Sequence, residues 1–200
     1  MTDGERRRSI YRPPWRFDLV VRPGVPRLIS DADLIEACAA TLSAAGAPAP
    51  AALAIVLTGD AEIAELNAVH LGEQGPTDVL SFPLLPPEAF PPHEPDPDRG
   101  ESPTVVAGVR LPSEGFVLPP GRRTHLGDLV VSVERAIDQA TGGRGGQRGD
   151  QRWAPADELR LLVVHGTLHL CGWDHADPDE AAAMRRLERR LLGLEGTDSD

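Results

Sequence analysis

The chain has 200 residues, enough to bury one hydrophobic core and barely enough for two. Its net charge is −11, and its 20 basic residues are all arginine, so it is a poor binder of polyanions in bulk. Two cysteines exclude a disulfide framework, and the lack of a long apolar run or an apolar leader after Met1 predicts a cytoplasmic protein without a membrane segment.

The amino-terminal part of the chain is predicted to contain a tail, a strand and a helix. Residues 1–16 are rich in arginine and are expected to form a flexible tail, because termini are poorly ordered unless other segments hold them. A single domain then spans residues 17–194 and opens with a strand over residues 17–21. Ser30 and Asp33 have the spacing of a capping box, which predicts the start of the first helix.

The next predicted elements alternate between strand and helix. The apolar residues 53–57 predict a buried strand, and apolar side chains at helical spacing predict a helix from about Asp60. Pro76 and Pro83 bracket another predicted strand. Prolines so close to a strand indicate either a sheet edge or the ends of that strand, because proline donates no backbone hydrogen bond.

Two segments in the second half of the chain are predicted to lack regular structure. Residues 84–120 are rich in proline and acidic residues, which predicts a long surface insertion. Residues 141–152 are rich in glycine and arginine, which predicts a flexible loop. Between these segments, Gly127 and Asp128 lead into a predicted strand over residues 129–133.

The most informative segment is the histidine motif, the eleven residues from His165 to His175. His165 and His169 lie one turn apart on a predicted helix over residues 157–170 and therefore project from the same face. Gly172 is predicted to end this helix, so that the chain folds back and brings His175 to the same point. Three neutral imidazoles form a site suited to one Zn²⁺ per chain with a fourth position open for water, which is typical of catalysis.

Two further residues of the histidine motif bear on its chemistry. Asp174 either orients an imidazole or faces solvent, and the sequence leaves both readings open. Gly166 stands where the metzincin proteases, which share the histidine spacing, carry the glutamate that acts as general base. Without that carboxylate, peptide hydrolysis is disfavoured, whereas metal-assisted hydrolysis of another bond stays open.

Three blocks of the sequence together resemble the YbeY-type endoribonucleases, or rRNA maturation factors. The first block runs from Leu66 and Asn67 to the segment PTDVLSFP, which ends at Pro83. The second is LGDLV, beginning at Leu126. The third runs from Glu158 to the end of the histidine motif and contains H-G-x-L-H-L-x-G-x-D-H.

This resemblance implies a fold, a cofactor and a substrate. The fold is expected to be α+β, with a small mixed β-sheet packed by several helices and a zinc site between the penultimate helix and the turn that follows. Zn²⁺ held by His165, His169 and His175 is expected to support cleavage of single-stranded RNA in rRNA maturation and ribosome quality control. Ser81 and Asp128 are then expected to line the cleft and bind substrate, with a purely structural role for both as the alternative.

One position departs from the pattern of this family. Its members usually carry an arginine shortly after the Leu-Asn pair, where this chain has Leu71, and an expected contact to phosphate is thereby lost. Either Arg122, Arg123 or an arginine of residues 144–152 replaces it, or RNA cleavage is weak. His70 is a further candidate, although it also fits a histidine on a helix surface.

The primary hypothesis is therefore a zinc-dependent endoribonuclease whose partners are ribosomal RNA and the small ribosomal subunit or its associated factors. No membrane and no obligate protein partner are inferred. Whether water or the RNA 2′-hydroxyl attacks the phosphate is left open. The alternative is a ribosome-associated binding protein with a structural zinc and little or no cleavage, and a metalloprotease ranks third because of Gly166.

Overall fold

A computed structural model describes residues 4–92, 123–141, 154–175 and 177–194 of the chain. Its centre is a five-stranded sheet with the strand order β1-β2-β3-β5-β4. The strands are β1 (Arg6–Arg12), β2 (Trp15–Val21), β3 (Ala51–Thr58), β4 (Val79–Pro83) and β5 (Thr124–Ser132). The three inner strands run parallel, while β1 and β4 pair antiparallel at the two edges.

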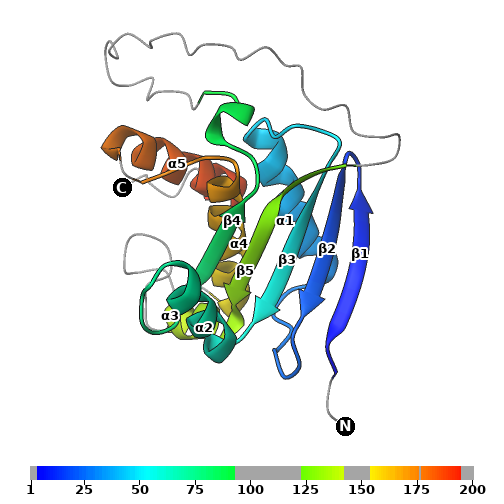
Figure 1. The fold of residues 1–200 in the computed structure, drawn as a ribbon, viewed down its shortest axis with the longest axis vertical. Coiled ribbons are helices and arrows are strands. Elements are labelled where there is room, and N and C mark those ends of the chain that lie inside the picture. Colours follow the sequence, from blue (N-terminus) through cyan, green and yellow to red (C-terminus); the bar gives the residue numbers. More distant parts are fainter. Residues whose placement is uncertain (1–3, 93–122, 142–153, 176, 195–200) are drawn as a thin grey trace.

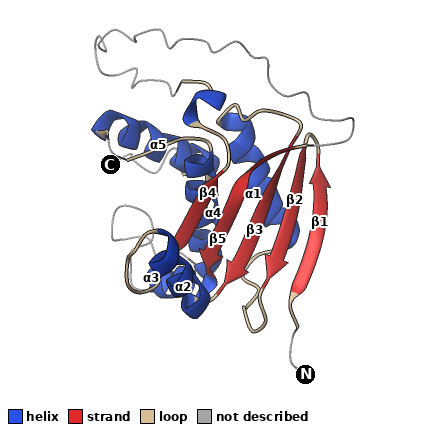
Figure 2. Cartoon of the chain, viewed as in Figure 1, coloured by secondary structure: helices blue, strands red, loops and turns tan. Residues whose placement is uncertain are grey.

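Helices cover the sheet unequally on its two faces (Figures 1 and 2). They are α1 (Asp31–Ala44), α2 (Asp60–His70), α3 (Val133–Thr141), α4 (Pro155–Leu170) and α5 (Pro178–Leu191), with a short 3₁₀ helix, η1, over Pro87–Ala89. Figure 1 shows α1 and α4 behind the sheet and α2 in front of it near β4. The predicted small mixed sheet packed by several helices is thus confirmed.

The main core lies between the sheet and the helices α1, α4 and α5. Phe17, Leu53 and Leu129 of the sheet are fully buried against the helix layer. A smaller apolar cluster on the other face joins Ile63 of α2 to Leu80 of β4 and Val130 of β5. Because adjacent residues of a strand point to opposite faces, Leu129 belongs to the main core and Val130 to the smaller cluster.

Several predicted elements are confirmed with small changes of boundary. Ser30 caps α1 by accepting a hydrogen bond from the backbone N–H of Asp33 at 3.1 Å. The proline-bracketed strand is β4, which lies at an edge of the sheet. The strand expected from residue 129 begins earlier, at Thr124, because Thr124 and His125 pair with β3 and Gly127 and Asp128 pair with both β3 and β4.

The prediction of a flexible tail over residues 1–16 is wrong for most of that segment. Residues Arg6–Arg12 form β1, which pairs with β2 through a tight turn at the two prolines 13 and 14. The arginines are held by acidic partners on α1: Arg8 contacts Asp31 at 3.0 Å, and Arg12 contacts Glu36 at 2.8 Å. Backbone pairing and these ion pairs together order a segment that its composition alone assigns to solvent.

The described part of the predicted 84–120 insertion is more structured than expected. η1 is followed by Phe90, which is only 6% exposed and belongs to the main core. This aromatic side chain buries enough apolar surface to order its segment despite the prolines around it. Residues 93–120 and residues 142–152 of the predicted glycine/arginine loop lie outside the described residues.

No helix among the described residues is both long enough and apolar enough to span a lipid bilayer.

Candidate metal centre

The histidine motif is built on the end of α4. Gly172 has a φ of +85°, which favours glycine, and it ends the helix in a Schellman motif. In this motif the N–H of Trp173 donates to Leu168 O at 3.2 Å, and the N–H of Gly172 donates to His169 O at 3.1 Å. Trp173 and Leu168 are both buried, which supplies the apolar contact that usually accompanies such a cap.

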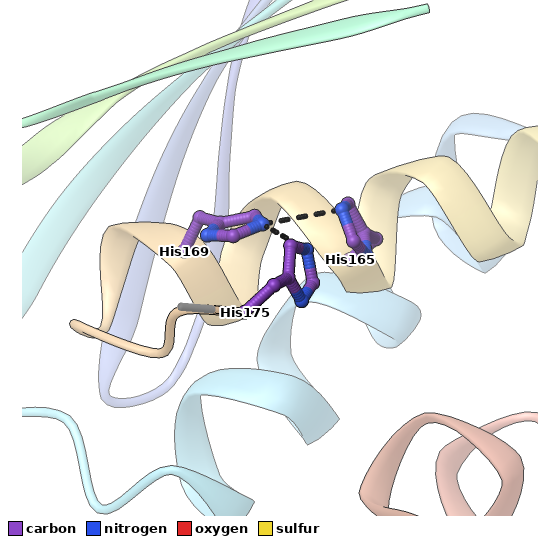
Figure 3. A group of neighbouring side chains, drawn as sticks. All are labelled: His165, His169 and His175. Carbon is purple, nitrogen blue, oxygen red and sulfur yellow. Dashed lines mark hydrogen bonds between the residues drawn. The ribbon is translucent and has the colours of Figure 1, made fainter. Parts of the chain in front are cut away.

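The turn brings the third histidine onto the first two, as the spacing predicts. Figure 3 shows the His165, His169 and His175 rings converging at the end of α4. His169 Nε2 lies 3.2 Å from His165 Nε2 and 3.0 Å from His175 Nε2. The three ligand atoms all lie within 4.8 Å of one another, so this group could hold a metal ion.

The outer nitrogens of two rings are held by hydrogen-bond acceptors. His169 Nδ1 lies 2.8 Å from the backbone carbonyl oxygen of Trp173, and His165 Nδ1 lies 2.7 Å from Glu188 Oε1. A carbonyl or carboxylate oxygen accepts, so each Nδ1 carries the proton. In a neutral imidazole the other nitrogen, Nε2, then presents a lone pair toward the centre of the cluster.

These lone pairs are what a cation needs. Two Nε2 atoms that both lack a proton repel one another at 3.2 Å unless a positive charge lies between them. A tetrahedral zinc with Zn–N bonds of about 2.0–2.1 Å separates its ligand nitrogens by about 3.3 Å, close to the distances of 3.0 and 3.2 Å found here. The donor set and these two separations are therefore those expected for a metal ion held by imidazole nitrogens.

Burial favours the neutral form of the central ring. Desolvation lowers the pKa of His169 below its usual value, and the neighbouring His165 and His175 lower it further. A neutral ring is the form that binds a metal, because protonated imidazole has no lone pair to donate. The environment therefore prepares His169 as a ligand.

Close packing explains the glycine after the first ligand. A Cβ atom added to Gly166 would lie 2.3 Å from Leu129 Cδ1 and 2.7 Å from Val79 Cγ2. A larger side chain at this position, such as the glutamate of the metzincins, would therefore force the Leu129 and Val79 side chains or α4 to move. The position faces β4 and β5, so a base placed there would also be buried away from the cluster, which strengthens the case against peptide hydrolysis.

Ser81 lies at this same contact between β4 and α4. Its hydroxyl donates to the Gly166 carbonyl oxygen at 2.9 Å and so links β4 to the helix next to His165.

Asp128 lies on the other face of the sheet, because its neighbour Leu129 points toward Gly166. There its Oδ1 is 2.8 Å from Nε2 of His125. The structure therefore does not bring Ser81 and Asp128 together in one cleft.

Asp174 and Arg123 form their hydrogen bonds with groups other than the three rings, although Asp174 is close enough for its charge to oppose the lowering of the His169 pKa. The Asp174 carboxylate accepts the backbone N–H of His175 at 2.6 Å, so it contacts the main chain next to a ligand and not an imidazole. Arg123 donates to Pro14 O at 2.9 Å and stacks over Tyr11, at the sheet edge opposite β4. Arg122 lies outside the described residues.

Two residues near the end of α2 occupy the region where the family arginine was expected. Leu71, the C-cap residue of α2, is 62% exposed. The ring of His70 packs edge-on against Phe82 at 4.9 Å between centroids. His70 therefore has an aromatic partner on the face of the sheet that Asp128 shares, because Phe82 and Asp128 are cross-strand neighbours.

The sequence prediction missed Glu188 of α5, which contacts His165. Its spacing from Met184 and Leu187 places it on the buried face of α5, and it is only 5% exposed. A carboxylate on the apolar face of a helix requires a polar partner, so this position carried a signal. The partner itself could not be identified, because it lies on another helix.

The two cysteines are buried and do not belong to the histidine cluster. Cys171 is 1% exposed and Cys38 is fully buried, and neither forms a disulfide. Burial raises the pKa of each thiol to about 12. Cys171 therefore packs in the main core.

Comparison with known proteins agrees with the geometry. Residues 29–194 match the family described as Endoribonuclease YbeY. A protein of that name from Dehalococcoides mccartyi (strain CBDB1) is 33% identical over 84% of this chain and 86% of its own length. Another, from Roseiflexus castenholzii, is 34% identical over 84% of this chain and 86% of its own length.

The match to a third relative covers more of this chain. The Endoribonuclease YbeY of Rhodospirillum rubrum is 34% identical over 92% of this chain and 74% of its own length. Among solved structures, the solution structure of TM1509 from Thermotoga maritima has a TM-score of 0.44 at 20% identity, over 86% of this chain and 93% of that one. With most of its length matched at this level of identity, the chain belongs to the YbeY endoribonuclease family.

Proposed function

We propose that this protein is a zinc-dependent endoribonuclease that cleaves single-stranded RNA in rRNA maturation and ribosome quality control. The observation that carries the proposal is the convergence of three imidazole Nε2 atoms, two of them with Nδ1 held by an acceptor. Membership of a family described as endoribonucleases supports RNA as the substrate. The proposed partners are ribosomal RNA and the small ribosomal subunit or its factors, in the cytoplasm.

The residues of the chain have separate tasks in this proposal. His165, His169 and His175 hold the cation, and Glu188 and the Trp173 carbonyl orient two of the rings. When bound, Zn²⁺ supplies a Lewis acid that stabilises negative charge on a phosphodiester. His175 is exposed, so a strand of RNA can reach the cluster from solvent.

The proposal also requires a basic group to hold the RNA backbone. Arg123 is engaged at the far edge of the sheet, which makes it a poor candidate for a phosphate beside the metal. We propose that Arg122 or an arginine of residues 144–152 holds the RNA backbone. Replacing each of them by alanine and measuring KM and kcat on the same RNA identifies the one that contacts substrate.

The central test removes a ligand and measures metal and activity together. His165→Ala and His169→Ala are expected to lose the one bound zinc and to stop cleaving a small-subunit rRNA precursor. His125→Ala is the matched control for metal content, since this histidine lies outside the cluster and is expected to leave the zinc stoichiometry unchanged. Chelation of the wild-type protein is expected to abolish cleavage and added Zn²⁺ to restore it, whereas full activity in metal-free protein refutes the proposal.

A second function is favoured by the exposed Leu71 and by the net charge of −11. In this alternative the protein binds the ribosome, its zinc is structural, and cleavage is weak or absent. Co-sedimentation with small ribosomal subunits separates the two functions. Association that persists without cleavage of the precursor supports the binding role, and metal-dependent cleavage supports the nuclease.

A further inference from the structure

We propose that Glu188 is a positioning residue of the metal centre, and that it makes the docking of α5 depend on the bound metal. The inference rests on the proposed metal binding and extends it to a residue 23 positions beyond its contact in the sequence. Its core is a single contact between two helices: Glu188 Oε1 lies 2.7 Å from Nδ1 of His165.

This contact differs in kind from the one that holds His169. The acceptor for His169 Nδ1 is the carbonyl of Trp173, which is fixed by the turn that ends α4 itself. The acceptor for His165 is a side chain of α5, whose position depends on how that helix packs. One ligand is therefore oriented locally and the other by tertiary structure.

The burial of Glu188 gives the contact its energetic weight. The residue is 5% exposed, and a buried carboxylate is costly unless a hydrogen-bond donor faces it. Nδ1–H of His165 is such a donor. By accepting this proton, Glu188 keeps the lone pair of His165 on Nε2, where His169 and His175 converge.

The contact also couples the metal to α5. A cation on Nε2 withdraws electron density from the ring and makes Nδ1–H a stronger donor to Glu188. If Glu188 strengthens metal binding, thermodynamic linkage requires that the metal strengthen the docking of α5 by the same factor. α5 also docks through an apolar face that includes Met184 and Leu187, and the metal-dependent gain is expected to add to that packing.

The first test measures zinc affinity by competition with a chromophoric chelator. Glu188→Ala is expected to weaken zinc binding about 10–100-fold, the usual effect of removing an outer partner of a ligand. Glu188→Gln is expected to lose less, because the amide oxygen still accepts from Nδ1–H. Asp128→Asn is the matched control, since it removes a carboxylate from a histidine outside the cluster, and its zinc affinity is expected to stay unchanged.

The second test needs no variant that might fold poorly. In metal-free wild-type protein, NMR of ¹⁵N-labelled histidine is expected to show His165 as the Nδ1–H tautomer. Neutral histidine in water prefers the Nε2–H tautomer, so an Nδ1–H signal from His165 reports the hydrogen bond to Glu188. Finding His165 as the Nε2–H tautomer in the wild type overturns the positioning role.

The third test follows α5 by amide hydrogen exchange. Zinc is expected to slow exchange along residues 178–191 in the wild type and to have a much smaller effect in Glu188→Ala, which removes the acceptor. Equal protection in both proteins, or equal zinc affinity of the wild type and Glu188→Ala, overturns the proposed coupling. Failure of the wild type to bind zinc contradicts the proposed function instead, while the tautomer measurement still decides whether Glu188 holds the ring.

Discussion

Substitution of Gly166 by alanine tests the packing that carries the first metal ligand. The added methyl group would lie 2.3 Å from Leu129 Cδ1, whereas ordinary contact begins at 3.4 Å. Leu129 is fully buried, so its side chain has neighbours on all sides. The Leu129 and Val79 side chains or α4 must therefore shift by about 1 Å, since native interiors hold little spare volume.

Two opposing free energies decide the size of the effect. Overpacking a well-filled site costs about 1–3 kcal/mol. Because the added methyl group overlaps both Leu129 and Val79, we expect the packing cost of Gly166→Ala to be about 3 kcal/mol. Alanine in a helix interior is more favourable than glycine by about 1 kcal/mol. The net expectation is a loss of about 2 kcal/mol in unfolding free energy, or a fall in Tm of about 4–8 °C for a domain of this size.

Urea unfolding of the metal-free proteins measures the stability change, and chelator competition measures zinc affinity. Zinc affinity is expected to fall as well, because the displaced turn carries His165. Leu129→Ala removes the worst overlap, so the double variant is expected to be less destabilised than the two single variants predict by addition. A Gly166→Ala protein with wild-type stability and zinc affinity refutes the packing argument.

Two more predictions concern the thiols and the response to acid. Cys38 and Cys171, each buried and with a pKa raised to about 12, are expected to resist a thiol reagent in native protein at about pH 8 and to react fully in denaturant; rapid native reaction contradicts their burial. Hydrogen bonds from Arg22 lower the pKa of Glu62 below its unfolded value of 4.5, so this group stabilises the fold above that pH and loses its contribution as pH falls through the folded value. Urea unfolding between about pH 3 and 6 is expected to show a flatter acid limb for Glu62→Gln than for wild type, and equal slopes contradict the assignment.

Local patterns in the sequence were sufficient to predict most of the helices and strands and the convergence of the three histidines. The Ser30 cap, the proline-bracketed edge strand and the helix over residues 157–170 all follow from rules that act within a few residues. The meeting of His165, His169 and His175 follows for the same reason. Two ligands share one helix face, and a glycine with positive φ closes the turn to the third.

Contacts between segments that are distant in the sequence explain the predictions that were wrong. Residues 6–12 have the composition of a solvated tail, yet partners on β2 and α1 order them as a strand. Phe90 likewise draws the start of the proline-rich insertion into the core. In both cases the stabilising partner lies elsewhere in the chain, where a local pattern cannot reveal it.

The sequence by itself determined which three side chains converge, because their spacing encodes the helix and turn that carry them. Only the tertiary structure decided how the cluster is supported. Glu188 contacts His165 from another helix, and the side chains of Leu129 and Val79 in the sheet leave room only for glycine at position 166. The physical reason is that ligand spacing is a property of the local backbone, whereas hydrogen bonding behind a ligand and packing beneath it depend on which elements meet in space.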